Sequence, residues 1–176
     1  MARLVLPVSA QDHSQGPENA PLTLVQYGDF QCPHCALAHP TVTQIARELE
    51  DSLRMVFRHF PLANVHPQAL KAAEAAEAAA SQGRFWDMAG LLYENQENLD
   101  DESLLKYAKK AKLDLKPFRK ELGSGIHSPR VRSDYLGGIR SGVKGTPTFF
   151  INGEQYEGSF EFDALVAALL KASRGR

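Results

Sequence analysis

The sequence predicts an α/β fold in which an all-helical insertion interrupts a central mixed sheet flanked by helices. Strand, helix and strand patterns follow one another with short links at the front of the chain. Helical patterns alone fill the middle, from His66 to about Gly138, and strand, strand and helix patterns return after Lys144. A β-α-β unit and a β-β-α unit that bracket a helical block indicate one sheet built from both ends of the chain.

The front of the chain contains the first three predicted elements. Residues 1–21 have an irregular pattern, with a short strand expected at 4–6. Residues 23–27 are β-branched and aromatic and lie between Pro21 and Gly28, which is typical of a buried strand. Apolar residues then recur at helical spacing over 36–51, and residues 53–60 form a second strand that Pro61 ends. These elements predict a right-handed β-α-β crossover.

The middle and the end of the chain are predicted as follows. Five helices are expected, over residues 69–83, 84–96, 103–112, 115–123 and 128–143. A strand over 146–151 precedes Asn152-Gly153, which is a strong hairpin signal, and a return strand over 154–157 and a helix over 160–172 follow. We therefore assign residues 1–62 and 139–176 to one discontinuous domain and residues 63–138 to the insertion.

Composition excludes several classes of protein. The 176 residues include 20 basic and 21 acidic ones, and this balance argues against a nucleic-acid-binding surface. No stretch approaches the roughly 18 apolar residues of a membrane span. The apolar run over 4–8 is shorter than the ~7–15 residues of a signal-peptide core, so a cytoplasmic location is predicted, or an extracytoplasmic one if a signal has been removed.

The cysteines are the main chemical signal. The chain has two, Cys32 and Cys35, so a fold held together by several disulfides is excluded. A zinc site built on them needs two further ligands, and no histidine pair with finger spacing follows, so no metal site is predicted. Two cysteines separated by two residues can instead close a redox-active disulfide, which needs no other cofactor.

The position of this pair predicts how it reacts. Cys32 lies after a strand and at the start of a helix, where unpaired N–H groups and the helix dipole favour a thiolate. Pro33 fits the first helical turn, and His34 can add positive charge or donate a hydrogen bond to the thiolate. A stabilised thiolate favours the reduced form, so the disulfide is predicted to be oxidising.

A second signal is Pro147, which follows Thr146 at the start of a late strand. A cis bond there would bring the backbone beside the cysteines, and Thr146 would then offer its N–H and C=O to an extended substrate. The local sequence by itself favours an ordinary trans proline at a strand start.

These residues together resemble the DsbA-like thiol–disulfide oxidoreductases of the thioredoxin superfamily. The resemblance covers about residues 16–170 and rests on GPENAPLTLVQYGDFQCPHC, on FRHFPL with the following HPQALKAAEAAEAAASQGRFWDM, and on GVKGTPTFFINGEQYEG. It implies a thioredoxin-like fold, an exposed nucleophile at Cys32, a buried resolving thiol at Cys35, and a cis Pro147 facing them. It also implies that the substrates are protein or peptide thiols and disulfides.

The sequence departs from this family at one position. Relatives often have a buried acidic residue six positions before the first cysteine, where it helps to move the proton of the second thiol. Gln26 stands there and cannot act as a base. Asp29 is closer in sequence, but its turn position predicts solvent exposure.

The remaining titratable residues are interpreted as structural. His59 is expected in a strand and His66 before a helix, and Glu74 and Glu77 are expected to be solubilising charges. The histidines without a spaced partner are His13, His39 and His127.

Three alternatives to a protein disulfide oxidoreductase stay open. A cytoplasmic reductase or glutathione-linked enzyme would differ in reduction potential and electron donor. A redox-inert peptide-binding module would keep its binding when Cys32 is replaced by serine and would show no turnover beforehand. A metal site shared between two chains would appear in metal analysis. For the leading reading we expect a monomer that works with an unidentified redox recycling partner.

Overall fold

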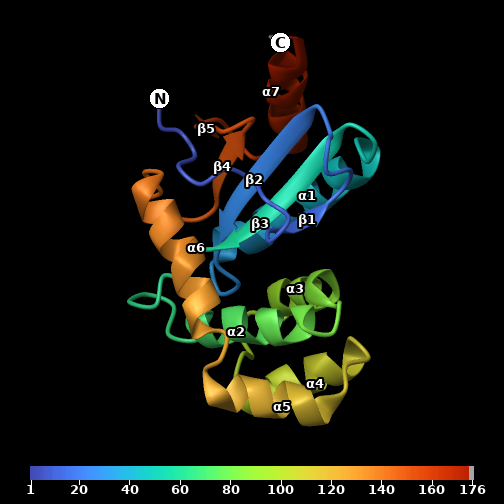
Figure 1. Ribbon diagram of the computed structural model, residues 1–176, viewed down its shortest axis with the longest axis vertical. Helices are drawn as coiled ribbons and strands as arrows, with labels where there is room; N and C mark the ends of the chain where they lie inside the picture. The colour runs from blue at the N-terminus through green and yellow to red at the C-terminus, as the bar shows by residue number, and fades with distance from the viewer. Residues whose placement is uncertain (175–176) are drawn as a thin grey trace.

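Five strands form one mixed sheet in the order β1-β3-β2-β4-β5 (Figure 1). The computed structural model describes residues 1–174; Gly175 and Arg176, the end of the predicted discontinuous domain, lie outside that range. The strands are β1 (His13–Gln15), β2 (Leu22–Gly28), β3 (Leu53–His59), β4 (Thr148–Ile151) and β5 (Glu154–Tyr156). β2 and β3 pair in parallel, whereas β1–β3, β2–β4 and β4–β5 pair antiparallel. The predicted mixed sheet is confirmed.

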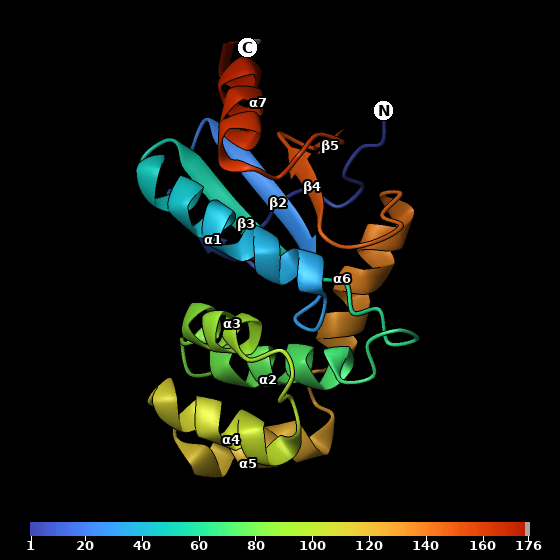
Figure 2. The same ribbon diagram turned by 180° about the vertical axis from the view of Figure 1, so that it is seen from behind.

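Helices cover both faces of this sheet. The helices are α1 (Pro33–Glu48), α2 (Ala69–Ala80), α3 (Phe85–Glu94), α4 (Asp101–Lys110), α5 (Leu115–Ser124), α6 (Ser128–Arg140) and α7 (Phe162–Arg174). Figure 2 shows α1 and α7 on the same side of the sheet, where Val42, Ile45 and Leu165 pack against its apolar side chains. On the other face, Val25, Val56 and Phe150 form a second cluster, and α6 contacts β3 there. Because both faces are covered, β2 and β3 are apolar along most of their length.

The insertion packs at one end of the sheet, below it in Figures 1 and 2, with α2 and α3 adjacent to the sheet and α4 and α5 further away. Its apolar core is continuous with the start of α1, because Phe30, Cys32, Cys35 and Phe57 belong to the same cluster of buried side chains as α2 to α5. The helical block therefore forms part of the surroundings of the cysteine pair. The exact division into two domains stays a prediction.

The β4–β5 hairpin forms as predicted. Asn152 and Gly153 connect the two strands with φ angles of 50° and 84°, a left-handed conformation that these two residue types tolerate best. The Asn152 side chain also accepts a hydrogen bond from the Thr23 N–H at 2.9 Å. The turn thus fixes the register of β4 beside β2.

The strand expected at residues 4–6 is wrong. The N-terminal segment pairs only through an isolated bridge between Arg3 and Glu154, and the strand β1 forms later, at His13–Gln15. Two backbone hydrogen bonds, from Leu4 N–H to Gly153 and from Gln155 N–H to Ala2, hold the start of this segment. Further along, Arg58 donates to the carbonyl oxygens of Leu6 and Pro7. A guanidinium group can satisfy several carbonyl groups at once, which a short strand pattern in the sequence does not reveal.

Arg58 also forms a buried ion pair with Asp12. Its Nε and Nη2 donate to the two carboxylate oxygens at 2.8 and 3.0 Å, and both side chains are 5% exposed. Burial alone would raise the pKa of Asp12, but the hydrogen bond and charge of Arg58 hold that pKa below its ordinary value. The pair fixes the N-terminal segment against β3.

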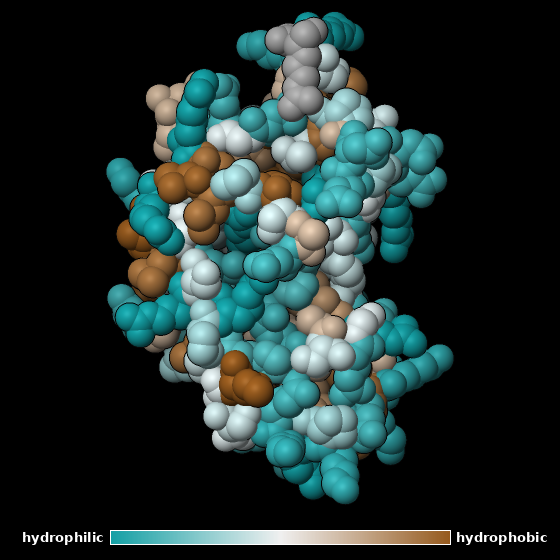
Figure 3. Space-filling model, viewed as in Figure 1, coloured by the Kyte–Doolittle hydropathy of each residue, from teal (hydrophilic) through white to brown (hydrophobic). Residues whose placement is uncertain are grey.

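One face of the molecule exposes apolar side chains beside polar ones. Figure 3 shows hydrophobic residues over α6 and the N-terminal segment, the elements that contain the exposed Val5, Leu6, Leu136 and Ile139. Within residues 1–174, no helix has both the length and the apolar character needed to cross a membrane.

Candidate active site

Cys32 lies at the point where the loop after β2 becomes helix α1. Its backbone is extended (φ −73°, ψ 121°), and Pro33 occupies the first helical turn. The Cys32 carbonyl accepts the first helical hydrogen bond, from the Ala36 N–H at 3.2 Å. Cys32 is thus the N-cap residue of α1, as the sequence predicted, and its sulfur lies beside N–H groups that the helix leaves unpaired.

The carboxylate of Asp29 holds the loop before Cys32. Its Oδ1 accepts from the Gln31 N–H at 2.7 Å, and its Oδ2 accepts from the Leu62 N–H at 2.9 Å and contacts His66 Nδ1 at 2.8 Å. The expectation that Asp29 is exposed is wrong, because its side chain is 0% exposed. A turn position predicted solvent exposure, but the chain after β3 folds back over this turn and supplies the donors.

The insertion contributes a second support for this loop. The side-chain amide of Gln96 donates to the carbonyl oxygens of Phe30 and Cys32, each at 2.8 Å. Gln31 in turn accepts from the backbone N–H of Gln68 at 2.8 Å. The sequence contains no signal for Gln96, because its partners lie more than 60 residues away in the chain.

Thr146 and Pro147 face the cysteine pair from the other side of the site. The Thr146–Pro147 peptide bond is cis, the conformation that the resemblance implied. Cys32 Sγ lies 3.4 Å from the Thr146 carbonyl oxygen, and both cysteines are free thiols. The expected exposure of Cys32 is wrong: the residue is 4% exposed, because the segment at Thr146 covers part of its sulfur.

The two thiols have very different acidities. The hydrogen bond from the Cys35 thiol is the largest cause that lowers the pKa of Cys32 from its ordinary value of 9.0 to about 5. Burial opposes this shift, while Thr146 and the N–H groups of Cys35 and His34 add to it. Burial raises the pKa of Cys35 well above 9.0, and the nearby Cys32 raises it further. At neutral pH Cys32 is therefore a thiolate and Cys35 a thiol.

The expected role of the His34 side chain stays a prediction. His34 is exposed, and it acts on Cys32 through its backbone N–H. Among residues 1–174, no hydrogen bond from the His34 imidazole to the sulfur is present. The stabilisation of the thiolate thus comes from the helix backbone, Cys35 and Thr146.

A pocket of about 250 Å³ is lined by Gln26, His39 and Tyr93, among others, and Tyr93 is close to Cys35. Gln26 Nε2 and the Tyr93 hydroxyl are buried and have no hydrogen-bond partner in the described part of the chain. Burial and the nearby Cys35 raise the pKa of Tyr93 well above its ordinary value. The aromatic rings of His39 and Tyr93 are 4.9 Å apart, and burial lowers the pKa of His39. Neither His39 nor Tyr93 was predicted from the sequence to lie near the cysteines.

We expect the reactivity of Cys32 to persist far into the acidic range. Alkylation of the reduced protein by iodoacetamide should decline only as the pH falls through about 5. Because the folded pKa lies below the ordinary one, the thiolate contributes stability that is fully present above pH ~9 and is lost as the pH falls towards the folded pKa. The stability prediction is checked by measuring the free energy of unfolding of the reduced protein and of a Cys32→Ala variant as a function of pH. An alkylation midpoint near pH 9 would contradict the reactivity prediction.

The described residues have a thioredoxin-like fold, which they share with solved DsbA proteins. The thioredoxin family model matches residues 9–171, so the chain belongs to the thioredoxin family. BdbD from Bacillus subtilis superposes with a TM-score of 0.86 over 99% of both chains at 20% identity. The α-DsbA1 protein from Wolbachia pipientis superposes with a TM-score of 0.82, over 98% of this chain and 95% of that one, at 24% identity. At these identities the likeness concerns the fold.

Curated relatives of higher identity are much longer proteins. Na⁺/H⁺ antiporter NhaA 1 from Salinispora arenicola is 46% identical over 98% of this chain, which corresponds to 26% of that protein. Na⁺/H⁺ antiporter NhaA 1 from Mycolicibacterium gilvum is 38% identical over 98% of this chain and 28% of its own length. The chain therefore spans about a quarter of the length of these relatives.

Proposed function

We propose that the protein is a thiol–disulfide oxidoreductase that exchanges disulfides with protein or peptide thiols through Cys32 and Cys35. The observation that carries the proposal is the difference in acidity within the pair. The pKa of Cys32 is lowered to about 5, and that of Cys35 is raised well above 9.0. Cys32 can thus attack, or leave, as a thiolate. Cys35 stays protonated until it resolves the mixed disulfide.

The exchange then has two steps. A substrate thiolate attacks the Cys32 sulfur of the Cys32–Cys35 disulfide, and Cys35 leaves and takes up a proton. A second substrate thiolate attacks the substrate sulfur of this mixed disulfide, and Cys32 leaves as its stable thiolate. The substrate loses two electrons and gains a disulfide, while the protein gains the two electrons as a dithiol. An oxidising partner must then remove them.

Thr146 and Pro147 are proposed to bind the substrate backbone. Thr146 lies within contact distance of Cys32 Sγ, so an extended peptide held by its N–H and C=O would place a sulfur atom beside Cys32. The Thr146 hydroxyl is buried and has no hydrogen-bond partner in the described residues. Thr146 is also among the residues that lower the pKa of Cys32.

When Cys35 reacts, its thiol proton must pass to an acceptor. Gln26 cannot accept it, because an amide side chain is not a base. The pocket beside Gln26 has room for water, and two unpartnered polar groups, Gln26 Nε2 and the Tyr93 hydroxyl, border it. We propose that water in this pocket carries the proton between Cys35 and solvent, along a path that Tyr93 and His39 line.

We expect Gln26→Glu to change the pH dependence of the step in which Cys35 resolves the mixed disulfide. A carboxyl group at this position, where Gln26 is 3% exposed, would have a raised pKa because burial disfavours its charge. It would therefore add a titration between acidic and neutral pH to the rate of that step, measured by rapid mixing with a glutathione mixed disulfide. Gln26→Met, which cannot titrate, is the control, and identical pH profiles for the two variants would exclude this position from proton transfer.

The proposed activity is tested by equilibrating the Cys32–Cys35 pair in glutathione buffers while thiolate absorbance is followed against pH. We expect a potential above the glutathione poise of the cytosol, roughly −220 to −320 mV, and ionisation of Cys32 at acidic pH. A low potential with an ordinary thiol pKa would instead identify a reductase on the same fold.

The compartment and the partners are part of the proposal. An oxidising disulfide persists where the surroundings are oxidising, and in reducing cytosol the same pair would be mostly dithiol. The low pKa of Cys32 therefore favours the extracytoplasmic alternative over the cytoplasmic location that the sequence predicted. One structural neighbour, from Salmonella enterica serovar Typhimurium, is described as a periplasmic thioredoxin-like protein. The monomeric state and the recycling partner stay predictions.

A further inference from the structure

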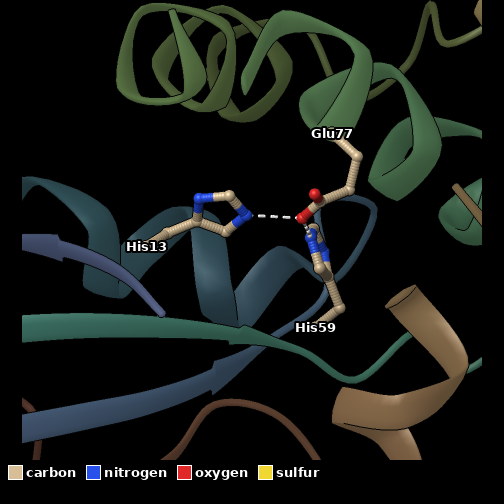
Figure 4. A group of neighbouring side chains, drawn as sticks. All are labelled: His13, His59 and Glu77. Carbon is tan, nitrogen blue, oxygen red and sulfur yellow. Dashed lines mark hydrogen bonds and ion pairs between the residues drawn. The ribbon is translucent and has the colours of Figure 1, made fainter. Parts of the chain in front are cut away.

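A cluster of two histidines and a glutamate lies outside the cysteine site. His13 from β1, His59 from β3 and Glu77 from α2 point towards one another (Figure 4). His13 Nε2 and His59 Nε2 contact the same carboxylate oxygen, Glu77 Oε1, at 2.5 and 2.7 Å. The sequence interpretation of Glu77 as a solubilising charge and of His13 as a histidine without a partner is wrong. The alanine-rich helix suggested an exposed face, but α2 is buried on nearly all sides.

Aromatic side chains pack against the two histidines, and all three side chains of the cluster are largely shielded from solvent. The side chains of His13, His59 and Glu77 are 15%, 1% and 9% exposed. Phe85 stacks on the His13 ring with 3.8 Å between ring centroids, and Phe57 lies edge-on to His59 at 5.3 Å. Rings fixed in this way need little reorganisation to present both nitrogens to one ligand.

The carboxylate remains charged in these apolar surroundings. Burial alone would raise the pKa of Glu77, but the hydrogen bonds from His13 and His59 hold it far below its ordinary value of 4.5. No lysine or arginine pairs with Glu77 among the ion pairs of residues 1–174. The partners of Glu77 among the described ion pairs are thus the two imidazoles, the same groups that would share a bound cation with it.

We propose that His13, His59 and Glu77 form a binding site for one divalent transition-metal ion, for which Zn²⁺ is the best-suited candidate. Two imidazole nitrogens and one carboxylate oxygen are a donor set that suits Zn²⁺, and all three ligand atoms lie within 4.8 Å of one another. At Zn²⁺ bond lengths of about 2.0–2.1 Å, neighbouring ligand atoms of a tetrahedron lie about 3.3 Å apart. The observed contacts must therefore open by less than about 1 Å, which small side-chain rotations provide.

Binding replaces protons by the ion. Each imidazole gives the lone pair of Nε2 to the metal, and its remaining proton resides on Nδ1. A ring that was doubly protonated releases one proton to solvent. His59 Nδ1 is buried without a partner in the described part of the chain, so its proton there lacks an acceptor. This absence is expected to weaken binding by about 10–100-fold relative to a site with full outer hydrogen bonding.

The three ligands leave a fourth position for water. His13 is the most exposed of the three, so the ion enters from the side of β1. Once bound, the ion joins the sheet edge at β1, the end of β3 and the first helix of the insertion. It therefore stabilises the contact between the N-terminal segment and the insertion.

The test is a titration with Zn²⁺ of a Cys32→Ser/Cys35→Ser variant, in which the dithiol can bind no metal. We expect one equivalent of Zn²⁺ by calorimetry, a higher temperature of unfolding in its presence, and absorption bands of tetrahedral Co²⁺. Adding His13→Gln should weaken binding at least about 100-fold, because two ligands remain. Glu77→Gln serves as the second ligand variant if His13→Gln does not fold.

A matched control is His127→Gln. His127 Nε2 contacts the carboxylate of Glu121 at 2.7 Å, and its side chain is 16% exposed, so it resembles His13. Within residues 1–174 this pair belongs to no group of three possible ligands. This variant should bind Zn²⁺ as the parent does. Absence of binding in the parent, equal binding after loss of His13 or Glu77, or loss of binding in the His127 control would each overturn the proposal. The result does not depend on the redox function, because the cysteines are absent.

Discussion

Replacing Asp12 with alanine is expected to lower the free energy of unfolding by about 3–5 kcal/mol, the typical cost of leaving one partner of a buried ion pair without the other. The Arg58 guanidinium would keep its bonds to Leu6 and Pro7 but would lose both carboxylate oxygens at 2.8 and 3.0 Å. The N-terminal segment would then lose the Asp12 side-chain contact with β3 and leave the Arg58 charge buried without its carboxylate. Urea unfolding followed by circular dichroism measures this difference.

The control for this prediction is an ion pair at the surface. Arg3 and Glu154 are joined at 2.8 Å, but their side chains are 77% and 52% exposed. Glu154→Ala should therefore cost less than about 1 kcal/mol. If Asp12→Ala and Glu154→Ala lower the free energy of unfolding by similar amounts, burial does not increase the contribution of the Asp12–Arg58 pair to stability.

Cys32→Ser is expected to reduce disulfide exchange by at least about a thousandfold, because a serine hydroxyl cannot form the mixed disulfide. Cys35→Ser should behave differently. Cys32 would still attack a substrate disulfide, but no second thiol would release the product, so the mixed disulfide would accumulate. Mass spectrometry of each variant after incubation with a disulfide-containing peptide distinguishes the two outcomes.

The double variant Cys32→Ser/Cys35→Ser supplies the background rate of this experiment, and circular dichroism confirms that each variant is folded. The thiolate at Cys32 depends partly on the hydrogen bond from the Cys35 side chain, so the pKa of Cys32 should rise in a Cys35→Ala variant, which lacks this donor. If the trapped adduct forms on Cys35 in the Cys32→Ser variant at the parent rate, the assigned roles of the two cysteines are reversed.

Much of this molecule could be predicted from short-range patterns. The parallel strands, the hairpin at Asn152-Gly153 and the helices of the insertion have local signals, and Cys32 at a helix start follows from strand and helix periodicity. Local patterns in the sequence are therefore sufficient to predict this fold.

The errors concern residues whose environment depends on distant segments. Asp29 is buried because residues from beyond β3 donate to it, and Glu77 is buried because β1 and β3 bring histidines to an alanine-rich helix. A polar residue in a turn or on an amphipathic helix has the same local pattern whether a later segment covers it or not. Charged side chains with buried partners are therefore the features that a single sequence conceals most effectively.

The hydrogen bonds of Gln96 with the loop before Cys32 affect the cooperativity of thermal unfolding. Three side chains, Asp29, Gln31 and Gln96, connect the start of α1 to the insertion and its preceding loop. The two parts also share one apolar cluster, so neither can lose its structure without exposing the other's buried surface. Scanning calorimetry should therefore show one unfolding transition for the sheet and the insertion together. A substrate or a disulfide that stabilises the loop before Cys32 should raise the temperature of this single transition.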